Sequence, residues 1–444
     1  MLSIENKTFV KSLAVLSLPI MIQMFISNLV NFSDLWMMGQ LDLTSVTAVG
    51  LSNRLYFLLA IFAFGINSGT AVFMGQFWGK GDKAGLHKSM GIAIILNLTL
   101  AIIFASIAFF IPHRFLGLVT QDAAVVEQAV AYLRVMALSY FITIITYTLV
   151  TALRAIKQPK VSLLASGIAL VVKISLNILF IFVLDLGIVG AAWGTVIARI
   201  VELIVNVIAI RRLRLPIFAH PRAYFAQDAA FMRQYIKVCL PVVANEFTWG
   251  LGVFLYDVAY QFAGSDAQGA IQITDNLGML FGIMGISVGS ASAVLISNAL
   301  GAGDRDGAIK ISRKCLLSGI CVAGFMCIML LISGPLILST YNITPEVRHM
   351  AQMNLFILAP MLIVRIANFM IIISVLRSGG DTLYCLIIDL TTVWLVGIPL
   401  AFLGARFLGL PIYLVLALVQ LEEVSKLFFN VARYKKMRWA NTLV

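Results

Sequence analysis

Ionisable side chains lie inside several of the long apolar stretches of this chain, and Asp34 is the first of them. A charge in the hydrocarbon core of a membrane is costly unless it is paired, hydrated or protonated, so such a residue is a candidate for function. The segment Leu35-Trp36-Met37-Met38 continues the apolar stretch, which argues against an aspartate that merely ends a helix at the outer surface. A carboxylate in this place can bind a proton or a cation.

Lys173, Asn177 and Thr195 are the polar residues expected near Asp34. Lys173 and Asn177 are four residues apart and share one face of a helix. Counted from the inner ends of their predicted helices, Asn177 lies about 25 Å and Asp34 about 30 Å along, and Thr195 lies about 10 Å below the outer end of its helix. We therefore predict one polar cluster. We expect Lys173 to pair with a carboxylate or to lose its proton, and a purely structural ion pair is the alternative.

A second set of acids is predicted in the second half of the chain, where Glu246 is the candidate for cation binding. It lies about 15 Å into its predicted helix, near the membrane midplane. Asp257 is the repeat counterpart of Asp34, because 257 − 34 = 223. The other acids of this set are Asp389, Glu422 and Glu423, with Arg365 and Lys426 at similar depths. A structural ion pair is again the alternative for Glu246.

Composition identifies the elements that must position these residues. Hydrophobic residues make up 61% of the 444 residues and charged residues 12%, which leaves too few polar groups for the surface of a soluble protein. Apolar stretches long enough to span a bilayer as helices predict an all-α membrane protein with twelve transmembrane helices. They cover residues 13–38, 50–76, 89–112, 126–153, 160–184, 188–212, 236–263, 269–299, 313–337, 348–377, 381–404 and 411–433.

An internal repeat divides these helices into two homologous six-helix bundles. Gly79-Lys80-Gly81-Asp82 returns as Gly301-Ala302-Gly303-Asp304 after 222 residues, and Leu153-Arg154 returns as Leu376-Arg377 after 223. We predict an N-terminal lobe at 1–212, a cytoplasmic linker at 213–235 and a C-terminal lobe at 236–444, with a central cleft.

Two prolines occupy similar places in the first helix of each half. Pro19 and Pro241 would loosen these helices, so they are candidate hinges. Simple tolerance of proline in lipid is the alternative.

The distribution of Lys and Arg predicts the orientation. Basic residues gather in alternate loops and in the C-terminal tail, which places both termini in the cytoplasm of a multi-pass protein of the cell (inner) membrane. They are Lys80, Lys83, Lys88, Arg154, Lys157, Lys160, Arg211, Arg212, Arg214, Arg222, Arg305, Lys310, Arg313, Lys314, Arg433, Lys435, Lys436 and Arg438. The net charge of +12 is thereby explained by orientation and the lipid bilayer, and no nucleic acid is expected.

Sequence motifs for other chemistry are missing. The chain has no P-loop and no His-Glu-x-x-His zinc motif, and its five cysteines have no metal-binding spacing. We expect no metal site and no cofactor beyond a coupling ion, and the protein is not expected to be an enzyme.

Together these motifs resemble the multidrug and toxic compound extrusion (MATE) family, of the multidrug/oligosaccharidyl-lipid/polysaccharide flippase superfamily, along essentially the whole chain. The resemblance rests on Asp34 before Met37-Met38-Gly39, the Gly79 motif, Leu153-Arg154, and the run from Gly187 to Thr195, together with their order. It implies an antiporter in which entry of H⁺ or Na⁺ drives an organic compound out.

The resemblance also implies site residues. An aspartate in the first helix is the usual coupling site of the family, supported by polar residues of the fifth helix and a threonine of the sixth, which correspond to Asp34, Asn177 and Thr195. Some members have an aspartate where Asn177 stands, and an asparagine is common where Lys173 stands. The segment 245–250 resembles members in which a glutamate of the seventh helix, here Glu246, is implicated in cation binding.

From these observations we expect export of amphipathic, often cationic organic compounds by alternating access, carried out by a monomer. H⁺ is favoured over Na⁺, because one acid beside a lysine is a poor metal-ion site, while Na⁺ coupling through Glu246 stays open. The alternatives are a flippase for lipid-linked saccharides, which would need several basic residues in its cleft, an intramembrane enzyme, which would need a catalytic pair, and a structural scaffold, which would leave the buried acids without purpose.

Overall fold

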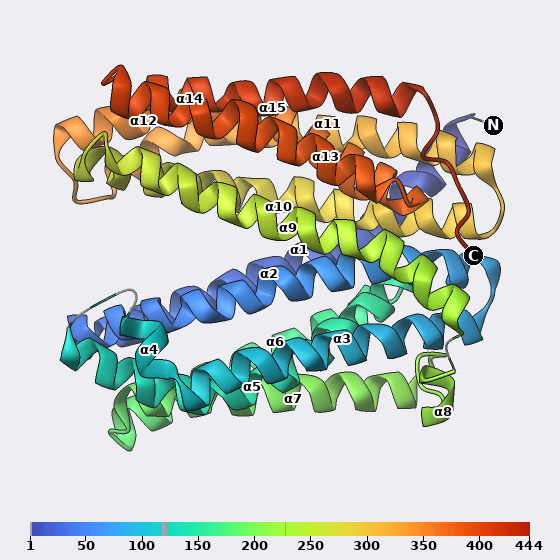
Figure 1. The fold of residues 1–444 in the computed structure, drawn as a ribbon, viewed down its shortest axis with the longest axis horizontal. Helices are drawn as coiled ribbons and strands as arrows, with labels where there is room; N and C mark the ends of the chain where they lie inside the picture. Colours follow the sequence, from blue (N-terminus) through green and yellow to red (C-terminus); the bar gives the residue numbers. More distant parts are fainter. Residues whose placement is uncertain (1, 118–119, 121, 227) are drawn as a thin grey trace. The chain divides into compact units, whose positions relative to one another are not determined.

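The computed structural model of the protein describes residues 2–117, 120, 122–226 and 228–444, with the side chains of residues 2–7, 31, 35 and 43 outside that description. All regular secondary structure in these residues is helical. The chain forms two compact units (Figure 1). The N-terminal unit comprises Ile22–Trp78 and Asp82–Arg233, and the C-terminal unit comprises Met1–Met21, Gly79–Gly81 and Gln234–Val444.

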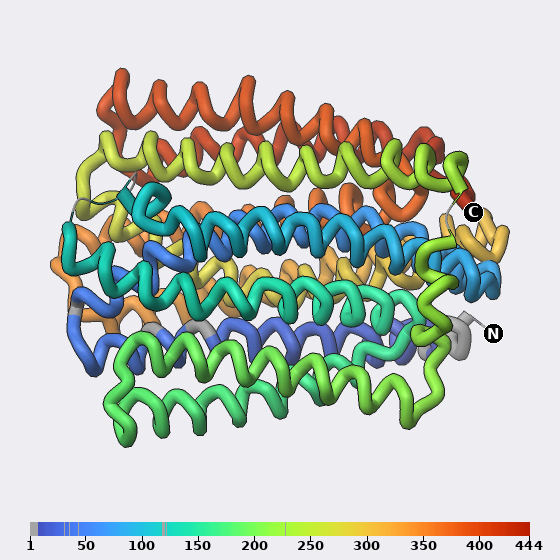
Figure 2. The backbone as a smooth tube through the Cα atoms, turned by 60° about the horizontal axis from the view of Figure 1, so that its bottom comes forward, coloured from blue at the N-terminus to red at the C-terminus, as the bar shows by residue number. Residues whose placement is uncertain are grey.

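Long helices running along a common direction build the N-terminal unit (Figure 2). They and the short helices between them are α1 (Leu2–Gly39, which begins in the other unit), α2 (Leu43–Lys80), α3 (Lys83–Phe110), α4 (Pro112–Gly117), α5 (Ala123–Ala155), α6 (Pro159–Asn177), the π-helix η1 (Ile178–Val183), α7 (Gly187–Arg212) and α8 (Pro221–Tyr224). α5 packs against α3 and α7, and α6 packs against α7. The core includes Met38, Leu55, Leu133 and Tyr140.

The C-terminal unit repeats this plan with more irregular helices. Its elements are α9 (Ala229–Gln261), α10 (Ser265–Gly301), α11 (Arg305–Ser339), α12 (Pro345–Phe369), η2 (Met370–Leu376), η3 (Arg377–Gly379), α13 (Thr382–Thr392), η4 (Val393–Gly397), α14 (Ile398–Phe402), η5 (Leu403–Phe407) and α15 (Ile412–Lys435). α10, α11 and α12 pack on one another, and α12 packs on α15.

Length and hydropathy of these helices confirm an all-α membrane protein. Among the described residues, eleven helices are long and apolar enough to cross a membrane. The helix at the twelfth expected position, α15, is continuous, but Glu422, Glu423 and Lys426 break its apolar stretch near the middle. The lobe boundaries 1–212, 213–235 and 236–444 and the central cleft stay predictions.

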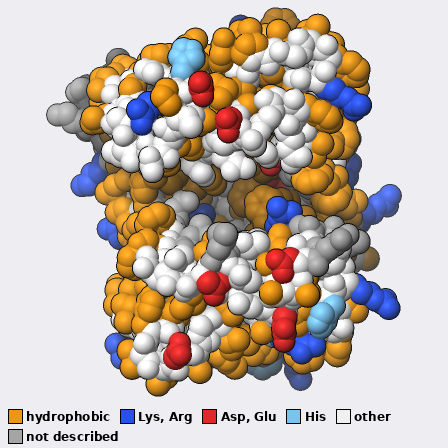
Figure 3. Space-filling model, turned by 90° about the vertical axis from the view of Figure 1, so that its left-hand side faces the viewer, with side chains coloured by type: hydrophobic (Ala, Val, Ile, Leu, Met, Phe, Trp, Pro, Cys, Tyr) orange, Lys and Arg blue, Asp and Glu red, His pale blue; other side chains and the backbone are white. Residues whose placement is uncertain are grey.

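Apolar side chains cover much of the outer surface. On the face shown in Figure 3, apolar side chains lie mostly toward the edges, and scattered charged groups lie among them and among other side chains. Large apolar residues with high exposure occur on many helices, for example Phe110 (76%), Leu336 (71%) and Phe428 (73%). Such exposure is unfavourable in water and is expected where helices face lipid.

The repeated glycine and aspartate motif has one structural explanation in both halves of the sequence. Gly81 and Gly303 have φ angles of +81° and +77°, a conformation that favours glycine. Asp82 then accepts a hydrogen bond from Gly85 N at 2.9 Å, and Asp304 accepts one from Gly307 N at 2.8 Å. The motif therefore ends one helix and caps the next.

The two candidate hinges lie within continuous helices. Pro19 is inside α1 and Pro241 is inside α9. Each lacks a backbone N–H, so one helical hydrogen bond is missing at each position. Their role in bending stays a prediction.

Candidate functional site

Asp34 of α1 is held by two residues of α6. Lys173 Nζ lies 2.6 Å from Asp34 Oδ2, and Asn177 Nδ2 donates to Asp34 Oδ1 at 3.1 Å. The Lys173 side chain is 5% exposed and that of Asp34 16%. The helical spacing of four residues places both partners on one face of α6. The structure thus brings three of the predicted residues together as an ion pair supported by an amide.

The neighbouring helix α7 makes room for Asn177. A methyl group at Gly194 would collide with Asn177 Oδ1, so the absence of a side chain at this position allows the two helices to approach closely. Asn177 is fully buried, and η1 begins at the next residue. Gly194 therefore helps to determine how Asn177 faces Asp34.

Thr195 differs from the sequence expectation in its bonding. It is buried, and its hydroxyl donates to Ala191 O at 3.0 Å, within α7. Thr195 lines the same small cavity as Lys173. It therefore contributes a hydroxyl oxygen to the surroundings of the ion pair.

A second polar network in the N-terminal unit centres on Glu202 of α7. Arg199 Nη1 donates to Glu202 Oε2 at 2.8 Å, and Ser166 Oγ donates to Glu202 Oε1 at 2.7 Å. Ser166 in turn accepts from Gln23 Nε2 at 3.1 Å, and Arg154 Nη2 donates to Gln23 Oε1 at 2.7 Å. The network connects α5, α1, α6 and α7.

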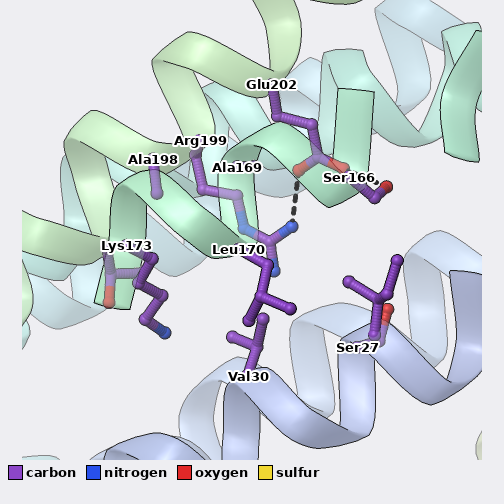
Figure 4. Close-up of a pocket in the computed structure, with 11 residues that line it drawn as sticks. Ser27, Val30, Ser166, Ala169, Leu170, Lys173, Ala198, Arg199 and Glu202 are labelled. Carbon is purple, nitrogen blue, oxygen red and sulfur yellow. Dashed lines mark hydrogen bonds and ion pairs between the residues drawn. The ribbon is translucent and has the colours of Figure 1, made fainter. Parts of the chain in front are cut away.

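A cavity of about 40 Å³ separates the two polar groups of the N-terminal unit (Figure 4). Lys173 stands at one part of its wall, and the Arg199–Glu202 pair with Ser166 stands at another. Apolar side chains between them include Val30, Ala169, Leu170 and Ala198.

Glu246 of α9 is the centre of a network in the C-terminal unit. Arg377 Nη1 lies 2.7 Å from Glu246 Oε1, and Arg377 Nη2 donates to Asn245 Oδ1 at 3.2 Å. Asn245 Nδ2 donates to Asp389 Oδ2 at 2.7 Å. The Arg377 side chain is 3% exposed, so Glu246 is paired with a buried guanidinium.

Lys426 of α15 gathers the other acids of this set. Its ammonium lies 3.0 Å from Asp389 Oδ1, 2.7 Å from Glu422 Oε1 and 3.7 Å from Glu423 Oε1. Tyr256 donates to Glu422 at 2.5 Å, and Asn368 donates to Glu423 at 2.8 Å. Asp257 has an exposed side chain on α9.

Several members of these networks escaped the sequence prediction. Gln23, Arg199 and Glu202 were not singled out from the sequence. Arg154 was counted among the basic residues that orient the protein, and Arg377 was recognised only as its repeat counterpart at the end of the predicted helix 348–377. Their burial is a property of the folded helix ends.

The described residues contain no group of three or more His, Cys, Asp or Glu side chains arranged to hold a metal ion. The carboxylates of Asp389 and Glu422 share the ammonium of Lys426.

Comparisons with known proteins agree with this architecture. A family model described as MatE matches residues 19–179 and 242–403, two segments that begin 242 − 19 = 223 residues apart. The chain is 24% identical to the uncharacterized transporter YisQ of Bacillus subtilis, over 91% of this chain and 89% of YisQ. It is 22% identical to the multidrug resistance protein MdtK of Edwardsiella ictaluri, over 89% of this chain and 87% of MdtK.

Solved structures share the fold. One is the outward-facing conformation of a multidrug resistance MATE family transporter of the MOP superfamily, with a TM-score of 0.86 and 18% identity, covering 96% of each chain. The resemblance predicted from the sequence is confirmed.

Proposed function

Because this chain belongs to the MatE family, we propose that it is an antiporter that exports amphipathic organic compounds, often cationic ones, in exchange for H⁺. Transport rather than catalysis is the family's activity, as the names of the multidrug resistance relatives indicate. Asp34 is the residue that binds the coupling proton, and Lys173, Asn177 and Thr195 shape its surroundings.

The observation that carries this proposal is the ion pair between Asp34 and Lys173, 2.6 Å apart. A proton that binds Asp34 removes its negative charge and leaves the Lys173 ammonium without its partner. The polar contacts between α1 and α6 then change, so protonation and deprotonation favour different arrangements of the two helices. Bending of α1 at Pro19 and of α9 at Pro241 would let each unit follow this change in an alternating-access cycle.

Two features of the structure favour H⁺ over Na⁺. A bound metal ion prefers several oxygen ligands and no adjacent ammonium. At Asp34 the ammonium of Lys173 occupies one carboxylate oxygen, and at Glu246 the guanidinium of Arg377 does so. Na⁺ binding at either acid would first require the displacement of a buried base.

The setting of this activity follows from the basic loops. We propose a monomer in the cell (inner) membrane with both termini in the cytoplasm, whose partners are the bilayer and the small organic substrate. The linker 213–235 then joins the lobes on the cytoplasmic side.

Transport into or out of proteoliposomes under separately imposed gradients tests the proposal. We expect a fluorescent organic cation to move against its gradient when a proton gradient is imposed without Na⁺, and the Asp34→Asn protein to lose this movement. Transport that follows only an imposed Na⁺ gradient would assign the coupling to another ion. Transport of lipid-linked saccharides with no effect of either gradient would favour a flippase.

A further inference from the structure

The cavity of the N-terminal unit is lined by Lys173, the ion-pair partner of Asp34, and by a second buried acid, Glu202. We propose that Glu202 is a second proton-binding residue, to which protons pass from the Asp34–Lys173 pair through water molecules in this cavity. The inference rests on the proposed H⁺ coupling and extends it, because it assigns the route by which the coupling proton leaves Asp34 toward the cytoplasm.

The cavity is large and polar enough for water. A water molecule needs about 10–15 Å³ of such space and two to four polar partners, so a cavity of about 40 Å³ holds at least two. Hydroxyl groups of Ser27, Ser166 and Thr195 line it, together with the charged ends near Lys173 and Glu202. Apolar side chains such as Leu170 form the rest of the lining (Figure 4).

Glu202 has the chemistry of a proton-binding site. Its side chain is 6% exposed, and a neutral buried carboxyl costs less than a buried carboxylate unless a base compensates it. Arg199 supplies that base, at 2.8 Å, while keeping a 27% exposed side chain of its own. The charged and titratable groups that face Glu202 are Arg199 of its own helix and Tyr147 of α5, and Lys173 of α6 lines the same cavity.

The position of Glu202 along the membrane gives the route a direction. Asp34 is five residues from the outer end of α1, about 8 Å, whereas Glu202 is fifteen residues from the outer end of α7, about 22 Å. From Glu202 the hydrogen bonds continue through Ser166 and Gln23 to Arg154. Arg154 stands in the last turn of α5, next to the basic loop assigned to the cytoplasm.

The step transfers one proton. The Asp34 carboxyl loses H⁺ and becomes a carboxylate that pairs with Lys173 again. The water molecules pass a proton along and are unchanged, and one Glu202 oxygen binds it. Glu202 becomes neutral and its pairing with Arg199 weakens, until the proton is released to the cytoplasm and the pair forms again.

Glu202→Gln tests the inference, with Glu127→Gln as the matched control because Glu127 is an exposed glutamate of α5. In proteoliposomes we expect Glu202→Gln to slow proton-driven transport by roughly tenfold or more. It should leave exchange of labelled for unlabelled substrate, which needs no net proton movement, close to wild type. Glu202→Asp should restore a large part of the proton-driven rate, and Glu127→Gln should change neither.

Two further results separate the possible failures. A wild-type protein without proton-driven transport would overturn the H⁺ coupling itself, and the Glu202 route with it. Wild-type protein that is proton-driven, with Glu202→Gln equally fast, would overturn the route alone. If Glu202→Gln folds poorly because Arg199 loses its partner, the double variant Arg199→Gln/Glu202→Gln removes both charges. Full proton-driven transport by that double variant would also overturn the route.

Discussion

An arginine makes the same contact in both units, but its partner is a neutral glutamine in the N-terminal unit and a charged glutamate in the C-terminal unit. Arg154 and Arg377 are repeat counterparts, as are Gln23 and Glu246, because 377 − 154 and 246 − 23 both equal 223. Arg154 reaches the amide oxygen of Gln23 at 2.7 Å, and Arg377 reaches the carboxylate of Glu246 at 2.7 Å. The geometry is the same in both units, but the C-terminal unit has an ion pair where the N-terminal unit has a hydrogen bond from a guanidinium to a neutral amide.

The difference extends to the residues around these arginines. Ser166 corresponds to Asp389, since 389 − 166 = 223. Ser166 donates to Glu202, and both residues line the cavity. Asp389 instead accepts a hydrogen bond from Asn245 and pairs with Lys426. The C-terminal unit thus ties its acids to two bases, and the N-terminal unit keeps two separate pairs with space between them. Buried charges that are fully paired stabilise one arrangement, and charges next to a cavity can change partners.

The largest effect that would distinguish the units is on transport. We expect Asp34→Asn to reduce proton-driven export by roughly 100-fold or more, to the level of empty vesicles, because it removes the group that binds the proton. Glu246→Gln should keep proton-driven export within a few-fold of wild type. Rates in proteoliposomes with matched protein amounts measure this, and the opposite ranking of the two variants would assign coupling to the C-terminal unit.

Loss of a base should destabilise the C-terminal unit more than the N-terminal unit, the reverse of the order expected for transport. Lys426→Met leaves the carboxylates of Asp389 and Glu422 buried without their ammonium, and breaking such a group costs about 3–5 kcal/mol. Lys173→Met should cost less, because Asp34 is more exposed, keeps its bond to Asn177 and can accept a proton. Thermal unfolding in detergent measures both. Lys435→Met, at the end of α15, is the control, and equal losses for Lys173→Met and Lys426→Met would refute the ranking.

An intermediate effect is expected at the contact between α6 and α7. Gly194→Ala pushes against Asn177 and should cost about 1–3 kcal/mol and slow export several-fold, because Asn177 then loses its position beside Asp34. Gly167→Ala is the matched control, since a methyl group there meets open space on the same helix as Asn177. If the two variants export equally well, the support of Asp34 by Asn177 has no role in coupling.

The smallest effect is expected from making the N-terminal unit resemble the C-terminal one. Gln23→Glu adds a carboxylate beside Arg154 but removes the N–H that Gln23 donates to Ser166, so stability should change by no more than about 1 kcal/mol. Thermal unfolding measures this, with proton-driven export recorded in parallel. A loss as large as that of Lys426→Met would show that the neutral amide is essential.

Sequence reasoning could predict the helices and one part of the site for physical reasons. Lys173, Asn177 and Asp34 were predicted together because helical spacing and depth in the membrane are both readable from residue numbers. The partners of Glu246 were not, since a contact between helices depends on how each helix is rotated about its axis. Arg377 shows this well: it is the last residue of the predicted helix 348–377, and its residue number does not reveal that the 3₁₀ turn η3 buries it against α9.

Exchange of substrate for H⁺ at Asp34 requires that Asp34 lose its proton when the substrate binds. The release of protons into a weakly buffered, Na⁺-free solution on addition of substrate to the purified protein measures this directly, with a pH-sensitive dye. We predict about one proton released per bound substrate by wild type and by Glu246→Gln, and none by Asp34→Asn although it still binds substrate. Unchanged release by Asp34→Asn, or its loss only in Glu246→Gln, would contradict the account.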